Sequence, residues 1–249
     1  MSHPSSLGVV SLLSAKKRGI QPIVVRFKFR RLVSKCANSH SLARLAPSFS
    51  PTQLGVGIPG GCEAAIHSAR RFLETMPKDN VVVKLDFSNT FNSLHRLDML
   101  QTIVNTAPEL FPYCHSAYAK PSLLFYGQYT ILSQEGSQQG DPIGPLLFCN
   151  TIQPLLASLT AVLRLGFMDD LTLGGSQQAV AEDVAVIMKA GADMGLKLNT
   201  SKCELITHPG CCVSDPTLLS FLQIPLTDAE LLGAPLFTGA TLDAACSRR

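Results

Sequence analysis

A run of β-branched residues that ends in a single acid constrains the fold more than any other feature of the sequence. The run Val81-Val-Val-Lys-Leu-Asp-Phe87 has the continuous apolar character of a strand that is buried on both faces. An acid at the end of such a strand is costly unless it is paired or bound to a metal ion. Asp86 is therefore either a functional residue, or a helix cap or paired surface acid with no further role.

Two more acids lie between apolar runs further along the chain. The segment Leu165-Gly-Phe-Met-Asp-Asp-Leu-Thr-Leu173 predicts a tight β-hairpin with Asp169 and Asp170 at its tip. Taken alone, this pattern also fits an ordinary solvated turn. Between the two acidic sites, residues 134–145 form a polar, glycine-containing segment that would let backbone approach a ligand closely.

The other patterns predict a mixed α+β chain. No G-x-G-x-x-G motif follows a predicted strand, which argues against a Rossmann sheet. The expected strands are a hairpin of residues 7–13 and 20–25, two short strands within 196–206, and a strand or turn at 231–236. Helices are expected over 63–75, from Pro145 until Pro154 kinks or ends the helix, and from Ser176 to Gly195. A further helix should begin at 88 or 89 and carry Phe91, Leu94, Leu97 and Leu100 on one face.

Composition excludes several classes of protein. With 249 residues and 46% hydrophobic content, the chain can bury a large core, and its net charge of +3 does not by itself indicate a nucleic-acid partner. The eight cysteines include no C-x-x-C pair and predict neither a zinc site nor a disulfide framework. The apolar stretch 7–13 is too short to cross a bilayer, so we expect no membrane association, no secretion, and a location in the nucleus or cytoplasm.

The three acids gain meaning from their order. A strand-end acid, a glycine-rich loop and a hairpin with two acids would supply oxygen ligands for two divalent ions about 4 Å apart, provided that the strand and the hairpin lie side by side. Oxygen ligands suit Mg²⁺ best. Such a pair of ions serves phosphoryl transfer to a nucleic-acid 3′-hydroxyl.

Several segments resemble reverse transcriptases of the non-long-terminal-repeat retrotransposon kind, over residues 10 to 237. The resemblance rests on Lys84–Asn92, Gln138–Phe148 and Phe167–Asp170, which look like the first three palm motifs, on Gly195–Cys203, which is similar to the fourth, on Leu232–Leu236, which is similar to the primer-grip turn, and on Gln21-Pro-Ile and Arg30-Arg-Leu, which resemble the fingers motif.

This resemblance implies a right-hand polymerase palm, an antiparallel sheet backed by helices, with partial fingers. Residues 1–80 would form the partial fingers, 81–210 the palm with its catalytic motifs, and 211–249 a primer-grip-like turn and tail. We expect no thumb within the chain. The implied activity is RNA-directed DNA synthesis on an RNA template and a DNA primer from deoxynucleoside triphosphates.

The resemblance also implies roles for individual residues. Asp86 and Asp169 would coordinate two Mg²⁺ or Mn²⁺ ions, with the backbone of Phe87 and with Asp170 as the less essential neighbour. Lys202 could donate a proton to pyrophosphate. Phe91 would crowd the 2′-hydroxyl of a ribonucleotide, or be a core residue of its helix, or both. Gln139 and Gly140 would line the nascent base pair, and Arg30 and Arg31 would contact the nucleotide. The nucleic acid would contact Lys16, Lys17, Leu232 and Gly233. The basic residues also fit an ordinary solvated face.

One departure from the family pattern keeps other functions open. Gln21 stands where the fingers motif normally has an arginine, and glutamine lacks the charge and the two-pronged hydrogen bonding that grip a triphosphate. The main alternative is therefore a catalytically inactive retroelement remnant that at most binds nucleic acid. The others are a protein whose acids are purely structural and an RNA-templated RNA polymerase, against which the bulk of Phe91 argues. The sequence does not indicate an oligomeric state.

Overall fold

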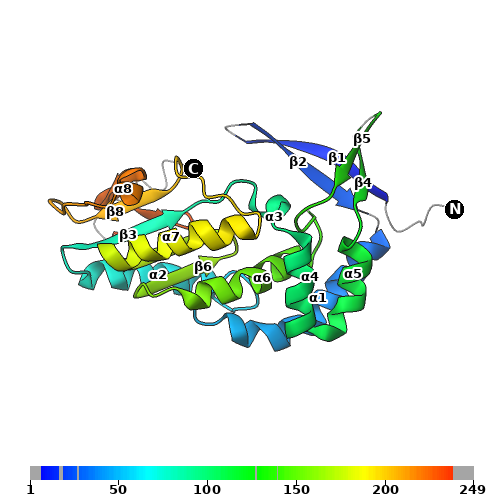
Figure 1. Cartoon of the computed structure of the whole chain (residues 1–249), viewed down its shortest axis with the longest axis horizontal. Helices are drawn as coiled ribbons and strands as arrows, with labels where there is room; N and C mark the ends of the chain where they lie inside the picture. Colours follow the sequence, from blue (N-terminus) through cyan, green and yellow to red (C-terminus); the bar gives the residue numbers. More distant parts are fainter. Residues whose placement is uncertain (1–6, 17–18, 27, 127, 139, 238–249) are drawn as a thin grey trace. The chain divides into compact units, whose positions relative to one another are not determined.

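The structure is a computed structural model that describes residues 7–16, 19–26, 28–126, 128–138 and 140–237, with backbone alone for 7–16, 19–26 and 125–126. The predicted α+β class is confirmed (Figure 1). The chain forms two compact units that are made of interleaved segments. Unit 1 comprises Met1–Ser48 and Asn89–Ile152, and unit 2 comprises Phe49–Ser88 and Gln153–Arg249.

Unit 2 is organised around a five-stranded sheet in the order β6-β7-β3-β8-β9. The central strand β3 is antiparallel to both of its neighbours, but β8 is parallel to β9, so the sheet is mixed and not antiparallel throughout as expected. Three consecutive valines of β3, residues 81–83, are completely buried, as expected for a strand that is covered on both faces. The strands are β3 Asn80–Leu85, β6 Leu163–Phe167, β7 Asp170–Ser176, β8 Glu204–Thr207 and β9 Leu222–Pro225.

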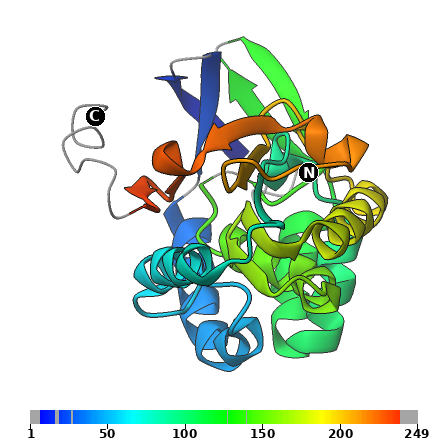
Figure 2. The same cartoon turned by 90° about the vertical axis from the view of Figure 1, so that its left-hand side faces the viewer.

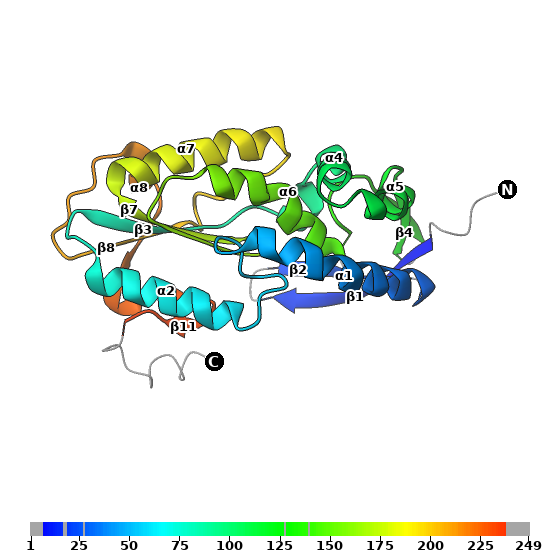
Figure 3. The same cartoon turned by 90° about the horizontal axis from the view of Figure 1, so that it is seen from below.

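Two helices cover opposite faces of this sheet (Figure 3). Helix α2 (Gly61–Thr75) packs its buried residues Ala65, Ala69 and Leu73 into a core cluster that includes Val82. Helix α7 (Gln177–Asp193) begins with the side chain of Ser176 accepting a hydrogen bond from the Ala179 amide, which confirms the predicted cap. Its residues Val180, Val184 and Ile187 are fully buried.

A small hairpin closes the described part of unit 2. Strands β10 (Glu230–Leu231) and β11 (Ala234–Pro235) pair antiparallel and lie beside α2 (Figure 2). The guanidinium of Arg70 on α2 donates two hydrogen bonds to the Pro235 carbonyl, at 2.8 and 3.0 Å. Between β8 and this hairpin lie α8 (Pro216–Leu219) and the 3₁₀ turn Leu226–Asp228.

Unit 1 combines a four-stranded sheet with helices. The sheet has the order β2-β1-β4-β5, in which β1 and β4 are parallel. No helix in the described ranges is both long and apolar enough to cross a membrane. The elements are β1 Leu7–Lys16, β2 Gly19–Arg26, β4 Ser122–Tyr126, β5 Tyr129–Ser133, α1 Lys28–Phe49, α3 Thr90–Ser93, α4 Arg96–Thr106, the 3₁₀ turn Pro108–Leu110, α5 Phe111–Tyr118 and α6 Gly144–Ser158, with the last residues of α1 and α6 belonging to unit 2.

Three expectations about these elements were wrong in detail. The helix expected after residue 88 is broken into α3 and α4, because Leu94 and His95 take extended backbone angles, and Leu97 is 76% exposed instead of buried. Of the two effects expected of Pro154, a kink or an end, the end does not occur, since α6 continues to Ser158 and buries Leu156. Residues 196–206 contain one regular strand, β8, and the single bridge of Leu198 to Phe87 instead of a second strand.

A buried carboxylate ties α7 to the entry of β6. Asp183 is 3% exposed and accepts hydrogen bonds from the amides of Thr160, at 2.9 and 3.0 Å, and Ala161, at 2.7 Å. The Thr160 hydroxyl donates a further bond to it at 3.1 Å. Removal of the carboxylate would therefore leave the buried Ala161 amide and the part-buried Thr160 amide without their acceptor.

We predict that Asp183→Ala lowers the free energy of unfolding by about 2–4 kcal/mol, the usual cost of leaving such donors unpaired. Urea denaturation followed by circular dichroism measures this. The matched control is Glu182→Ala on the same helix, where the side chain is exposed and bonds to Gln178. Equal destabilisation by both variants would contradict the role given to Asp183.

Candidate active site

The register of β3 against β7 brings two of the predicted acids together. Leu85 pairs with Leu171, so the next position on each strand places Asp86 beside Asp170. Asp86 follows the last residue of β3, and Asp170 is the first residue of β7. The adjacency of strand and hairpin that the sequence analysis required is therefore present.

The β6–β7 hairpin is the tight turn that the sequence predicts. Phe167 pairs with Asp170, which leaves Met168 and Asp169 as its two loop residues. Met168 has a φ of 57°, in the left-handed region that L-residues rarely adopt. The turn differs slightly from expectation, because Asp169 is in the loop whereas Asp170 is already in the strand.

The carboxylates of Asp86, Asp169 and Asp170 influence one another electrostatically. Burial raises the pKa of Asp170, and the neighbouring carboxylates of Asp169 and Asp86 raise it further, whereas Lys84 acts in the opposite direction. Lys84 itself forms an ion pair with Glu204 at 2.5 Å. The three carboxylates therefore form one cluster of like charge at the end of β3.

The segment around Lys202 holds Asp86 in place. The Asp86 carbonyl accepts a hydrogen bond from the Asn199 amide at 2.7 Å, and the Asp86 amide donates to the Cys203 thiol at 3.4 Å. The Nζ of Lys202 lies 3.7 Å from Oδ2 of Asp86. The predicted proton donor is thus next to the predicted metal ligand.

One oxygen of Asp86 bears directly on metal binding. Its Oδ2 is buried and accepts no hydrogen bond, and the Lys202 ammonium compensates its charge only from 3.7 Å, so the lone pairs of this oxygen stay available to a metal ion. In the part of the chain that the structure describes, no three His, Cys, Asp or Glu side chains are already arranged to hold an ion. The donor chemistry fits divalent metal ions, because carboxylate and backbone oxygens are the ligands that Mg²⁺ prefers, although the side chains are not preset as a cage.

Gln53, which the sequence did not indicate as a functional residue, supports the loop of the β6–β7 hairpin. Gln53 is completely buried, and its side-chain amide bonds to both backbone groups of Met168. It belongs to residues 50–61, a proline- and glycine-rich segment that reads as a simple connector in the sequence. No local pattern distinguishes this glutamine from other loop residues.

The predicted nucleotide contacts Phe91 and Gly140 belong to unit 1. Phe91 is half-buried and packs against Phe148 with a ring-centroid distance of 4.9 Å, so it has the core contacts that were one of its two expected roles. Gly140 has a φ of 77° in the turn that precedes α6. Two bonds, from the Asp141 amide to the Gln138 carbonyl and from the Gly144 amide to the Asp141 carbonyl, hold that turn.

Arg30 lies in a mainly buried cluster within unit 1, whereas Arg31 is exposed. The guanidinium of Arg30 lies 3.7 Å from the Asp141 carboxylate and donates to the Ala117 carbonyl at 3.1 Å. Tyr118 donates a hydrogen bond to the same carboxylate at 2.8 Å, and Arg30 and Arg96 both lie over its ring. Arg30 therefore stabilises the turn at Asp141, a contact that the sequence did not predict.

The remaining predicted contacts are described only in part. Lys17 and Gln139 lie outside the described residues, and only the backbone of Lys16 is described, at the end of β1. Leu232 and Gly233 form the turn of the β10–β11 hairpin with φ values of 51° and 80°. The predicted turn at this position is thus present.

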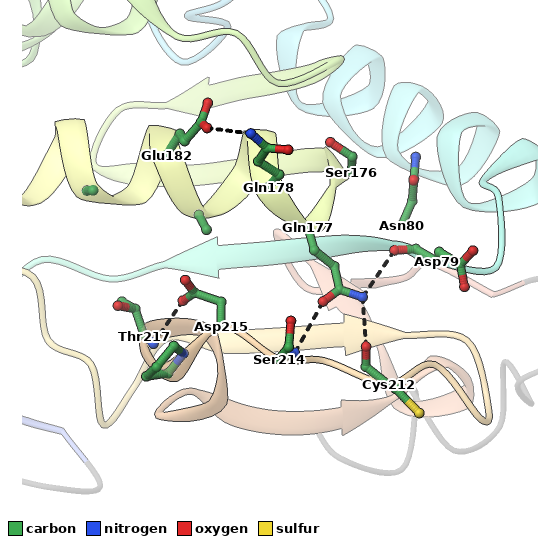
Figure 4. A pocket seen from close by; sticks show the side chains of 13 residues that line it. Asp79, Asn80, Ser176, Gln177, Gln178, Glu182, Cys212, Ser214, Asp215 and Thr217 are labelled. Carbon is green, nitrogen blue, oxygen red and sulfur yellow. Dashed lines mark hydrogen bonds between the residues drawn. The ribbon is translucent and has the colours of Figure 1, made fainter.

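A cavity of about 880 Å³ lies at the other end of β3, and Asp86, Asp169 and Asp170 are not among its lining residues. It adjoins Asn80 and Ser176, the first residue of β3 and the last residue of β7 (Figure 4). Gln177 bridges its walls by donating to the carbonyls of Asp79 and Cys212 and accepting from the Ser214 amide. Its polar groups bond chiefly to one another, so we assign no ligand to it.

Comparison with known families identifies the class of protein. The profile of the family described as "Reverse transcriptase (RNA-dependent DNA polymerase)" matches residues 15–233. The chain therefore belongs to the reverse transcriptase family. No curated protein sequence matches it significantly.

Solved telomerase structures share the fold. Apo telomerase of Candida tropicalis, truncated from its C-terminal domain, is 14% identical with a TM-score of 0.62, over 84% of this chain and 51% of that one. Telomerase of the same organism with a TWJ fragment of telomeric RNA is also 14% identical with a TM-score of 0.62, and the match covers 84% of this chain and 42% of that one. The Candida albicans enzyme with such a fragment is 11% identical with a TM-score of 0.54, over 83% and 43%. The chain thus spans about half or less of these proteins.

The like-charge cluster predicts that removal of one charge stabilises the metal-free protein. Because folding raises the pKa of Asp170, ionised Asp170 destabilises the folded state, and this destabilisation develops as pH rises from the unfolded pKa through the folded one. Asp170 is exposed at the start of β7, so water screens the repulsion. We expect Asp170→Asn to raise Tm by about 1–2 °C at pH 7 in the presence of a chelator.

Thermal denaturation between pH 4 and pH 7 checks this, because the gain should shrink toward low pH, where the wild-type side chain is neutral as well. The control is Asp193→Asn, which removes an exposed charge near the end of α7. An unchanged or lower Tm of Asp170→Asn at pH 7 would contradict the repulsion.

Proposed function

We propose that this chain is the RNA-directed DNA polymerase domain of a retrotransposon of the non-long-terminal-repeat kind, transferring deoxynucleotides to a primer 3′-hydroxyl. One observation carries the proposal: the β3–β7 register brings Asp86 beside Asp170 in a reverse transcriptase fold. The Oδ2 of Asp86 accepts no hydrogen bond and is paired with Lys202 only at 3.7 Å, which leaves its lone pairs available to a divalent ion and supports the proposal.

In this proposal residues 81–210 supply the palm, 1–80 the partial fingers and 211–249 the primer-grip-like turn and tail. Asp86 and Asp169, with Asp170 and the Phe87 carbonyl, would hold two Mg²⁺ or Mn²⁺ ions. When bound, these ions supply the positive charge that stabilises the attacking and leaving oxygens. Because the carboxylates are not preset as a cage, their side chains would rotate toward the ions. The compartment would be the nucleus or the cytoplasm.

The other residues would act on protons, nucleotides and nucleic acid. Lys202, close to Asp86, would donate a proton to the leaving pyrophosphate. Phe91, Gln139, Gly140 and Arg31 would contact the incoming nucleotide or the nascent base pair. The turn at Leu232 and Gly233, held to α2 by Arg70, would contact the primer, and Lys16 and Lys17 the phosphates. The buried contacts of Arg30 favour support of the Asp141 turn over direct contact with nucleotide.

The second candidate function is nucleic-acid binding without turnover. Gln21 favours it, because a neutral side chain at this position grips a triphosphate less strongly than arginine. The two candidates share the fold and differ in catalysis. A single polymerisation assay therefore separates them.

The assay measures incorporation of labelled deoxythymidine triphosphate on an adenine-homopolymer RNA with a DNA primer, in Mg²⁺ or Mn²⁺. We expect Asp169→Asn to reduce incorporation by at least about a hundredfold, because it removes a metal ligand and several kcal/mol of transition-state stabilisation. Asp193→Asn should retain wild-type activity. A folded wild-type protein that binds the primer–template but incorporates nothing would favour the second candidate.

The proposed gate makes a separate prediction about sugar selection. We expect Phe91→Val to reduce the preference for deoxythymidine triphosphate over uridine triphosphate by about tenfold, because the smaller side chain leaves room for a 2′-hydroxyl. The measurement is the ratio of kcat/KM for the two substrates. Phe111→Val, which shortens another half-buried aromatic residue of unit 1, is the control. If Phe91→Val lowers only stability, the residue belongs to the core alone.

A further inference from the structure

Residues 52–55 lie directly against the base and loop of the β6–β7 hairpin. The Thr52 carbonyl accepts from the Gly166 amide at 2.6 Å, and the Leu54 amide donates to the Gly166 carbonyl at 2.7 Å. These bonds form a parallel bridge between Gln53 and Gly166. Gly166 belongs to β6, so residues 52–55 pair briefly with the outer edge of the β6–β7 hairpin.

The side chain of Gln53 continues this contact into the hairpin loop. Its Oε1 accepts from the Met168 amide at 2.8 Å, and its Nε2 donates to the Met168 carbonyl at 3.1 Å. The same Oε1 also accepts from the Gly55 amide at 3.0 Å. One buried amide group therefore satisfies both backbone groups of the loop residue that precedes Asp169.

The neighbouring residues leave little freedom for this arrangement. A Cβ at Gly55 would lie 2.4 Å from the Met168 amide nitrogen, so only glycine allows this approach. The Thr52 hydroxyl accepts from Gln153 Nε2 at 3.1 Å, which ties the segment to α6. The left-handed φ of Met168 is an unfavourable conformation that surrounding contacts must maintain.

We propose that Gln53 is a positioning residue, which fixes the Met168–Asp169 loop so that the Asp169 carboxylate stays in place for a divalent ion. In this role it acts through the backbone of Met168 and would not itself bind the ion. The metal-binding part of this inference rests on the proposed function, whereas the hold on the loop rests on the contacts alone. Residues that orient a metal ligand in this indirect way typically change metal affinity or activity by about 10–100-fold when they are replaced.

The test compares Gln53→Met with Gln177→Met in the full chain. Both remove one bridging amide from unit 2 and keep a similar side-chain length, but Gln177 lies at the opposite end of β3. Two quantities are measured for each variant: hydrogen exchange of the Met168 amide, by mass spectrometry with fragmentation, and the dissociation constant for Mn²⁺ alone, by calorimetry. Gln53→Glu is added for the exchange measurement, because it retains the acceptor oxygen that faces the Met168 amide.

We expect Gln53→Met to speed exchange at Met168 and to raise the Mn²⁺ dissociation constant about tenfold, whereas Gln177→Met leaves both at the wild-type value. Gln53→Glu should protect the Met168 amide better than Gln53→Met does. Unchanged exchange or unchanged Mn²⁺ affinity in Gln53→Met would overturn the proposal, as would an equal change in Gln177→Met.

Two outcomes separate this proposal from the proposed function. A wild-type protein that binds no Mn²⁺ would overturn the two-metal function and the link from Gln53 to the ion, while the exchange data still judge the hold on the loop. A variant Gln53→Met that does not fold leaves the wild type and Gln53→Glu to decide. Unprotected Met168 in the wild type would then overturn the proposal.

Discussion

The repulsion between carboxylates at the end of β3 is the constraint on which much of unit 2 depends. Asp86, Asp169 and Asp170 come within electrostatic reach of one another, and among the described residues Lys202 and Lys84, itself paired with Glu204, oppose their charge. A sheet that was optimised for stability alone would not gather like charges at the end of its most buried strand. The surrounding contacts compensate, through the fully buried valines of β3, the bonds to residues 199 and 203, and the contact of Gln53 with the hairpin.

This arrangement fits a division of work between the sheet and the loops. The register of β3 and β7 determines the backbone positions of Asp86 and Asp170, and no loop movement is needed to bring these backbones together. The orientation of Asp169 depends instead on the two-residue loop, whose conformation is intrinsically unfavourable at Met168. The rigid part of the site is thus determined by strand pairing, whereas its adjustable part is determined by side-chain hydrogen bonds.

The sequence predicted those features that follow from local patterns. The valine run, the apolar residues on both sides of Asp169 and Asp170, and the cap at Ser176 each indicated their element correctly, because burial and capping leave short-range signatures. The break between α3 and α4 could not be predicted, since Leu97 follows helical spacing and nevertheless faces solvent. Gln53 and the cluster of Arg30, Tyr118 and Asp141 join residues between 23 and 115 positions apart, and no local pattern reports such contacts. The roles given to individual site residues remain predictions.

The interleaving of the two units has a consequence for how the chain can fold. The central strand β3 is synthesised early, yet its two partners, β7 and β8, come roughly 90 and 120 residues later, after most of unit 1. Pairing over such separations is slow, because a long loop must close before any contact rewards it. Until then a valine-rich strand has both edges open, which is the kind of segment that associates with other chains. The same order of segments that surrounds β3 with neighbours in the finished molecule thus leaves it unprotected during synthesis.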